Sequence, residues 1–179
     1  MSTDVRRVYE KIVIYKTRTG FTKQYAQWIA EEIDCEIVDY RNISSFDFNG
    51  YDLIIYGGRV HAGKIDELGK IKKMFANSKY KLVVFATGAT PFEAKEEIKK
   101  IMANNFDDNS IPNFYMQSGL CYEKMSLPDK TIMKALSKIL SNKNNKSKIE
   151  EGTVNAINKS YDISDKKFIV PLIKCIENI

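Results

Sequence analysis

Short apolar runs alternate with longer amphipathic stretches along this chain of 179 residues, and this alternation constrains its fold more than any other feature. Five runs have the length and composition of buried strands: 11–15, 35–39, 52–56, 82–86 and 114–116. Each of the first four is followed by a turn or a helical pattern, as parallel strands joined by crossover helices require. The sequence therefore predicts an α/β fold, a doubly wound parallel sheet of five strands with helices on both faces.

The spacing of apolar residues locates the helices. Apolar side chains three or four residues apart predict helices over 21–33, 65–75 and 132–140. Another helix is expected to begin with Thr90 as its cap and Pro91 at its first position, with acidic residues near its positive end. A last helix is expected over 171–177, because proline is tolerated in a first turn. Residues 141–151 are polar and rich in lysine, which indicates a solvated loop.

The charges are spread evenly along the chain. The net charge is +5, and residues 1–90 carry 14 basic and 11 acidic side chains against 14 and 12 in the remainder. No basic cluster interleaved with aromatic residues occurs, so we expect no nucleic-acid partner. The longest stretch without a charged residue runs from 109 to 122 and is rich in polar residues, so no membrane span is expected. No linker or repeat divides the chain, and we expect a single domain over 1–179.

The cysteines argue against a metal site. Cys35, Cys121 and Cys175 lie far apart without a CxxC pair, and the chain has a single histidine. A zinc finger or an iron–sulfur site needs more closely spaced ligands, so we expect no bound metal. Unpaired thiols are typical of the cytosol. Residues 1–11 lack the apolar core of a secretory signal, and we therefore expect a cytoplasmic protein of unknown oligomeric state.

Three loops follow strands of the predicted sheet at the edge where doubly wound folds bind their ligands: 16–22, 57–64 and 87–92. The first of these has the residues of a phosphate site. Hydroxyls at Thr17, Thr19 and Thr22 can each donate to a phosphate oxygen, and the following helix presents unpaired amides at its positive end. Gly20 lets the backbone approach the anion closely. These donors suit a single terminal phosphate rather than a chain of phosphates.

The second loop also reads as GxxxxGK, from Gly58 to Lys64, which is the pattern of a nucleoside-triphosphate loop. That pattern needs Ser or Thr next, to hold Mg²⁺, and the next residue is Ile65. Such a loop also follows the first strand of its domain, whereas this one follows the third. A triphosphate site is therefore disfavoured.

The first loop and its flanks resemble the opening motif of the flavodoxin family. The family pattern is matched by Val13-Ile14-Tyr15, Thr17, Gly20, Thr22, Ala26 and Ile29. The resemblance implies a five-stranded parallel sheet of order 2-1-3-4-5 and bound FMN as the cofactor. It implies three sets of cofactor-binding residues: Thr17, Arg18, Thr19, Gly20, Phe21 and Thr22 at the phosphate; Gly57, Gly58, Arg59, Val60, His61, Ala62 and Gly63 against the flavin ring; and Thr87, Gly88, Ala89 and Thr90 at its pyrimidine side.

The function that follows is a redox protein that carries electrons through bound FMN to and from partner proteins. No catalytic residue is implied, since the flavin supplies the chemistry. Electron-carrying flavodoxins are strongly acidic, whereas this chain is basic. The run 115–126 resembles the protoporphyrinogen dehydrogenase branch of the family, which implies an alternative: an oxidoreductase that uses a quinone acceptor and contacts a membrane surface. A structural insertion of the long-chain flavodoxin type explains the same run equally well. A flavin-free binding module with the same fold is a third hypothesis.

Overall fold

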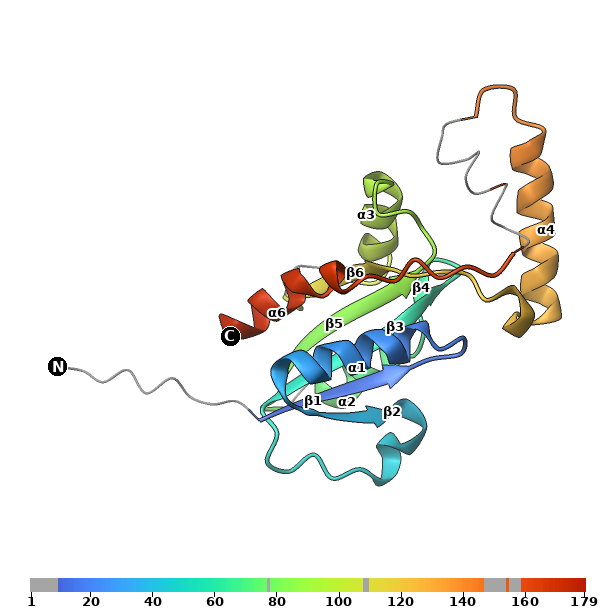
Figure 1. The fold of residues 1–179 in the computed structure, drawn as a ribbon. Helices are drawn as coiled ribbons and strands as arrows, with labels where there is room; N and C mark the ends of the chain where they lie inside the picture. The colour runs from blue at the N-terminus through green and yellow to red at the C-terminus, as the bar shows by residue number, and fades with distance from the viewer. Residues whose placement is uncertain (1–9, 77, 108–109, 147–153, 155–158) are drawn as a thin grey trace.

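A parallel sheet forms the centre of the computed structural model, which describes residues 10–76, 78–107, 110–146, 154 and 159–179. The strand order is β2-β1-β3-β5-β6, and all four pairings along this path are parallel (Figure 1). The strands are β1 (Lys11–Lys16), β2 (Glu36–Asp39), β3 (Leu53–His61), β5 (Lys81–Gly88) and β6 (Asn113–Gln117). A short strand β4 (Lys64–Ile65) pairs antiparallel with β3. The predicted five-stranded parallel sheet and its order 2-1-3-4-5 are confirmed.

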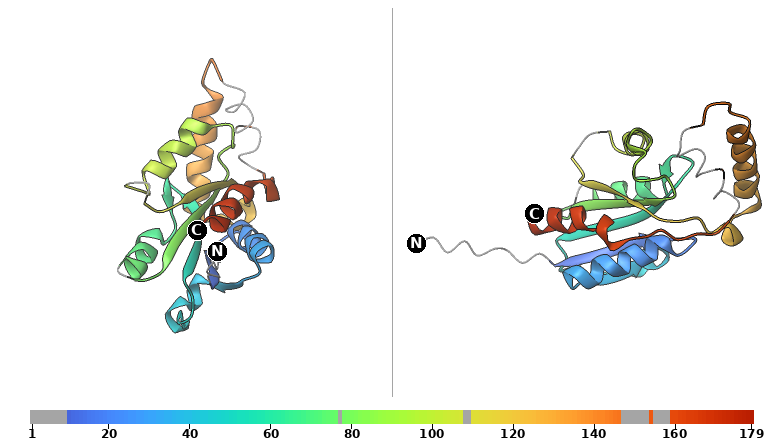
Figure 2. Two further views of the ribbon diagram at one scale, coloured as in Figure 1. Left: turned by 90° about the vertical axis from the view of Figure 1, so that its left-hand side faces the viewer. Right: turned by 45° about the horizontal axis from the view of Figure 1, so that its top comes forward.

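Helices cover both faces of the sheet, as the nearly continuous apolar strands predicted (Figure 2). On one face lie α1 (Phe21–Ile33) and α6 (Val170–Glu177), and on the other α2 (Leu68–Phe75) and α3 (Lys95–Ala103). Successive residues of β1 illustrate the division, since Val13 belongs to the core under α1 and α6 and Ile14 to the core under α2. Two hydrophobic layers therefore hold the sheet in place.

The prediction of a loop over 57–64 is wrong, because most of this segment is strand. The structure continues β3 through Gly57 and Gly58 to His61 and then reverses into β4. Gly57 and Gly58, placed in that loop by the prediction, are packing residues of a buried strand. A Cβ on Gly57 would overlap the Phe85 ring, and one on Gly58 would lie 2.7 Å from Ile65 Cγ2.

The hairpin also shortens the helix predicted over 65–75. Ala62 and Gly63 form the reversal with φ values of 47° and 76°. Ile65 is then used in β4, so that α2 begins only at Leu68.

The predicted cap at Thr90 is also wrong. Helix α3 begins at Lys95, follows Ala94 and has no side-chain cap, while its first turn does hold acidic residues as expected. The Ala94 amide donates to the Pro91 carbonyl at 2.9 Å, which makes 91–94 a turn before the helix. The Thr90 carbonyl instead accepts a hydrogen bond from the Tyr115 hydroxyl at 3.0 Å. Thr90 is thus bonded to β6, and the helix begins five residues later.

Between β6 and α6 the chain leaves the sheet. A short 3-10 turn (Tyr122–Lys124) leads to α4 (Leu127–Ser141), which contains the predicted helix 132–140 and stands apart from the sheet (Figure 1). No residue of α4 is buried. Within the predicted loop 141–151, residues 142–145 are exposed, and 147–151 lie outside the described residues. The predicted last helix is confirmed as α6, with Pro171 in its first turn. No helix in the described part of the chain has the length and apolar character needed to cross a membrane.

Candidate functional site

The first loop places an uncapped helix end at the carboxyl edge of the sheet. Gly20 precedes α1 with φ 105°, a conformation that favours glycine, and no side chain caps the helix. The Gly20 amide donates to Thr17 Oγ1 at 3.0 Å, so the turn is closed by its own hydroxyl. The amides of the first turn have no partner within the helix. A Cβ on Gly20 would meet no atom within 4 Å, so the backbone conformation, rather than a close neighbour, requires glycine here.

The start of α1 and the end of β5 are joined by a buried pair of hydroxyls. Thr22 Oγ1 and Thr87 Oγ1 lie 2.8 Å apart, and each residue is 1% exposed. Thr22 stands in the first turn of α1, and Thr87 lies inside β5 rather than in a loop. The two hydroxyls bond to each other, which fixes the start of α1 against the end of β5.

The third loop is tied to β6 along its length. The Gly88 carbonyl accepts from the Ser118 amide at 2.8 Å. The Phe92 amide donates to Gln117 Oε1 at 2.9 Å. The tyrosine contact to Thr90 lies between these two, and Ala89 is half-buried beside it. The segment is therefore held rigidly, and polar groups of β6 contribute to the site.

The second set of predicted residues divides between the sheet and the hairpin. Gly57 and Gly58 are buried within β3, whereas Arg59 and Val60 are half-buried and His61 is exposed at its end. Arg59 Nε lies 2.7 Å from Asp66 Oδ2, an ion pair across the hairpin. The part of this segment that is open to a ligand is thus 59–63, with Ala62 and Gly63 at its tip.

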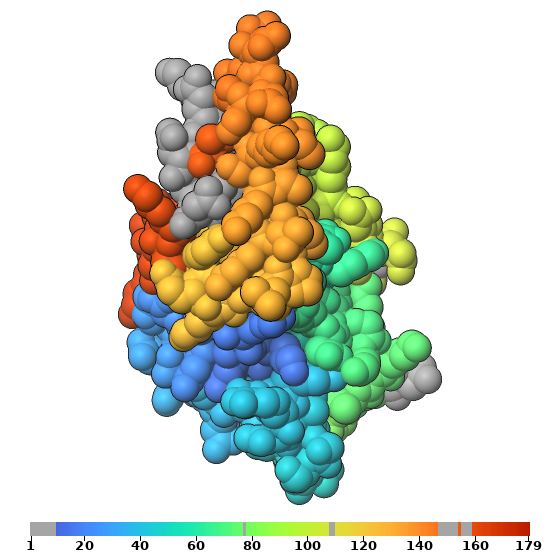
Figure 3. Space-filling model, turned by 90° about the vertical axis from the view of Figure 1, so that its right-hand side faces the viewer, coloured from blue at the N-terminus to red at the C-terminus, as the bar shows by residue number. Residues whose placement is uncertain are grey.

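A carboxylate that sequence reasoning missed connects two of these segments. Asp129, in the first turn of α4, has Oδ1 2.9 Å from His61 Nε2 and Oδ2 3.7 Å from Arg18 Nη1. Figure 3 views the molecule from this end and shows the segment before α4 lying against the first loop. The hydrogen bond with His61, with a smaller contribution from Ser126, holds the pKa of Asp129 below its usual value. A cation–carboxylate cluster therefore borders the site.

Tyr25 secures the same edge from the core. Its hydroxyl donates to the Gln117 carbonyl and accepts from the Asp165 amide at 3.1 Å. Burial raises the pKa of Tyr25, so the phenol stays neutral and able to donate. One side chain of α1 thus connects β6 with the segment that leads into α6.

Comparison with known proteins settles the family. The family model described as a flavodoxin domain matches residues 12–147, which is most of the chain and includes all three predicted loops. The chain belongs to the flavodoxin family. The search of curated proteins found no match.

Two solved structures show likeness to this flavodoxin-family chain. One is a candidate flavoprotein from Bacteroides uniformis, 15% identical, covering 62% of this chain and 92% of its own, at a TM-score of 0.39. The other is a candidate flavoprotein from Bacteroides eggerthii, 13% identical, covering 76% of this chain and 100% of its own, at a TM-score of 0.42. At these scores the likenesses add nothing to the family assignment.

The first loop fits the phosphate end of the flavin that the flavodoxin family implies. It combines uncapped amides, open space beside Gly20 and the hydroxyls of Thr17 and Thr19. The hydroxyl of Thr17 accepts from an amide and keeps its own proton to donate. Arg18 adds a cation, and Phe21, the first residue of α1, is half-buried. Residues 59–63 and 88–90 are the parts of the other two predicted sets that are not buried.

The residues that the sequence did not reveal come from other elements. Gln117, Ser118 and Asp129 reach the site only because β6 and α4 are brought to it by the fold. Gln117 and Ser118 lie in the run 115–126, but its resemblance to a branch of the family did not assign them to the flavin site. The sequence does contain a signal for Asp129. Ser126 is a residue type that caps helices, and Asp129 lies three residues later, in the first turn of the capped helix.

Proposed function

We propose that this chain binds FMN at the carboxyl edge of its sheet and serves as a redox protein. The observation that supports the proposal is the uncapped start of α1, with its left-handed glycine and hydroxyl-bearing turn. When bound, a flavin supplies the electron transfer. The chain would hold the phosphate with amides of 18–22 and the hydroxyls of Thr17 and Thr19, and it would enclose the ring between 59–63 and 88–90.

A titration with two flavins tests this proposal. FMN and riboflavin share the ring and differ in the phosphate, so we expect FMN to bind at least about tenfold more tightly, because a charge-assisted hydrogen bond contributes about 1.5–3 kcal/mol. Binding is followed by the quenching of flavin fluorescence and by the visible absorption spectrum. If the purified chain binds neither flavin, the proposal fails and a flavin-free module is left.

A matched pair of threonine variants locates the phosphate. Thr19 lies in the phosphate turn, and Thr131 lies in α4, where its hydroxyl donates to the Leu127 carbonyl at 3.0 Å. We expect Thr19→Val to weaken FMN but leave riboflavin unchanged, and Thr131→Val to change neither. Equal losses for both flavins in Thr19→Val would contradict a phosphate contact there.

The alternative function, electron transfer to a quinone at a membrane surface, has one observation in its favour. Helix α4 exposes Ile132, Leu136 and Ile139 (60%, 38% and 68% exposed), and helical spacing places its lysines on the opposite face. An amphipathic helix with lysines on its polar face is the type that binds anionic lipid surfaces. We propose peripheral membrane contact through α4 on this basis.

Sedimentation with vesicles and an enzyme assay test the alternative. We expect the chain to sediment with vesicles of anionic lipid and to lose that binding when Ile132 and Ile139 are both replaced by serine. Oxidation of protoporphyrinogen with menaquinone as acceptor then decides whether porphyrin is the substrate. An absence of porphyrin product would leave an electron carrier as the function, with partner proteins as its acceptors.

A further inference from the structure

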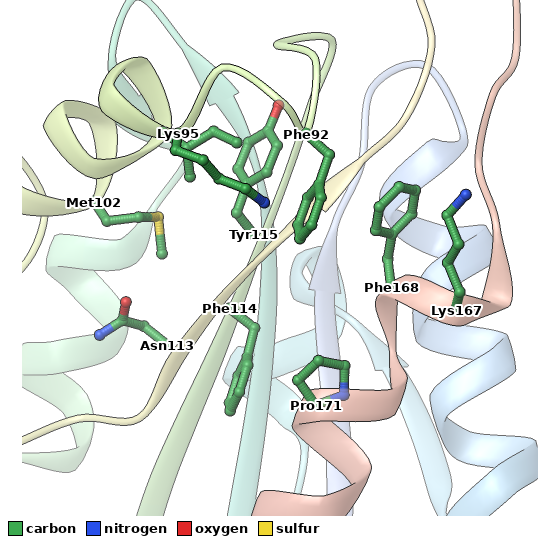
Figure 4. Close-up of a pocket in the computed structure, with 10 residues that line it drawn as sticks. Phe92, Lys95, Met102, Asn113, Phe114, Tyr115, Lys167, Phe168 and Pro171 are labelled. Carbon is green, nitrogen blue, oxygen red and sulfur yellow. The ribbon is translucent and has the colours of Figure 1, made fainter.

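A cavity lies beside the edge strand β6, apart from the residues of the candidate flavin site. Its volume is about 510 Å³, and it lies between α3, the edge strand β6 and the start of α6 (Figure 4). This volume falls within the range of about 300–1,000 Å³ typical of small-molecule sites. None of the predicted cofactor residues lines it. The cavity is therefore a feature that the flavin proposal does not use.

The walls of the cavity are apolar and aromatic. The rings of Phe92 and Phe168 lie 5.0 Å apart at an angle of 49°, and Phe92 is 36% exposed. Phe114 of β6 and Met102 of α3 add to the lining (Figure 4). Such walls favour a ligand with a flat or extended apolar body, which gains free energy when its surface leaves water.

The charge on this cavity is positive. Lys95 lies with Nζ 3.2 Å from the centre of the Phe92 ring, and Figure 4 shows its amine directed between that ring and Tyr115. Lys167 also lines the cavity, but its amine points away and pairs with Asp165 Oδ2 at 3.2 Å. None of the ten lining residues carries a carboxylate. Among the described residues no carboxylate lies within ion-pair distance of Lys95, so its charge is left for a ligand.

The floor of the cavity adds backbone donors. The Pro112 carbonyl and the Ser118 amide, at the two ends of β6, are hydrogen-bonded to β5. The backbone N–H and C=O groups of the even-numbered residues of β6 therefore point toward β5. Because backbone groups alternate along a strand, those of Asn113 and Tyr115 point to the open edge. Both residues line the cavity. Their amides can donate to an anionic head group held near Lys95.

We propose that this cavity binds a small organic anion with an apolar body, such as an aromatic or medium-chain carboxylate. The apolar part lies between the phenylalanine rings, and the carboxylate pairs with Lys95. A cation of the same shape is repelled by Lys95, and a neutral molecule gains nothing from it. The site is independent of the flavin, although Phe92 ends the loop that the flavin proposal uses.

Calorimetric titration of the full chain with two matched amphiphiles tests the proposal. The probes are decanoate and decylammonium, which share one alkyl chain and carry opposite charges, each used below its micelle-forming concentration. We expect decanoate to bind at one site and decylammonium to bind at least about tenfold more weakly. Equal affinity for the two probes would overturn the proposal, because an apolar surface without charge selection would account for it.

Variants assign the binding to this cavity. We expect Lys95→Gln to weaken decanoate about fivefold, the size of an exposed ion pair, and Lys100→Gln on the same helix to leave it unchanged. Met102→Trp fills the cavity and should abolish binding, with a circular dichroism spectrum checking the fold.

The exposed face of α4 is a rival site for decanoate. If the Ile132→Ser, Ile139→Ser double variant removes decanoate binding, or Lys95→Gln does not weaken it, the proposal is wrong. Because no flavin is present in these titrations, their failure leaves the FMN proposal untouched.

Discussion

At the scale of single residues, the most informative contact is the one between the hydroxyls of Thr22 and Thr87. Both were predicted to contact the cofactor, and the structure shows them buried against each other. A buried hydroxyl that loses its partner is costly, whereas two apolar groups of the same shape can replace a bonded pair with little loss. The pair thus fixes the start of α1, and with it the first loop, against the end of β5.

A double-mutant cycle tests this role. Thr22→Val and Thr87→Val should each lower the free energy of unfolding by about 1–3 kcal/mol, because each leaves one buried hydroxyl unpaired. The double variant should lose less than the sum of the two. Unfolding in urea measures all three, with Thr131→Val in α4 as a control expected to change stability by less than about 0.5 kcal/mol. Strictly additive losses would contradict a direct contact.

At the scale of elements, α4 is held to the rest of the molecule chiefly near its first turn. Asp129 contacts His61 and Arg18, while none of the fifteen residues of the helix is buried. Since the hydrophobic contacts that usually fix a helix are few here, charge determines where α4 lies. A change in Asp129 should therefore affect this helix and spare the sheet.

Hydrogen exchange of the backbone amides tests that expectation. At pH 7, Asp129→Asn should reduce protection in α4 about fivefold, the scale of an exposed ion pair, with the sheet unaffected. Lys138→Gln, on the same helix, is the control and should have no effect. Because the pKa of Asp129 is lowered in the folded chain, its contribution is complete above the ordinary value of 3.8 and is lost as pH falls below it. The wild type should then approach the variant, and equal protection at pH 7 would refute the role.

At the scale of the whole molecule, the fold is completed by its last helix. Leu172 of α6 is fully buried in the core beneath α1, together with residues of β1, β3 and β5. The C-terminal segment thus covers β1 and β3, which lie more than a hundred residues earlier in the chain, and Tyr25 is bonded to the segment that leads into it. The sheet and α6 should therefore unfold together.

A pair of truncations in α6 tests this coupling. Leu172→Ala should lower the free energy of unfolding by about 2–5 kcal/mol, since it leaves a cavity in the core. Val170→Ala, at a residue that is 45% exposed, should change it by less than about 0.5 kcal/mol. Urea unfolding followed by far-ultraviolet circular dichroism gives both values in one transition. A small effect of Leu172→Ala would mean that α6 is not part of the cooperative core.

The predicted fold succeeded where the pattern is local and repeated. Apolar runs such as 11–15 and 82–86 are nearly continuous because their strands are covered on both faces, and helical spacing placed α1 correctly. The prediction failed at Gly57, Gly58 and Thr90, where residues typical of turns and caps serve other purposes. Their roles depend on Phe85, Ile65 and Tyr115, which lie far from them in sequence or in a separate element.

Hydrophobic periodicity within the sequence was enough to predict the class of fold, and the motif in the first loop was enough to predict the family and, through it, the order of strands. The contacts of Thr22 with Thr87 and of Asp129 with His61, and the apolar cavity with Lys95 beside β6, are visible only in three dimensions. These are contacts between residues many positions apart, and the closing of such loops is set by the packing of the whole core rather than by any local preference.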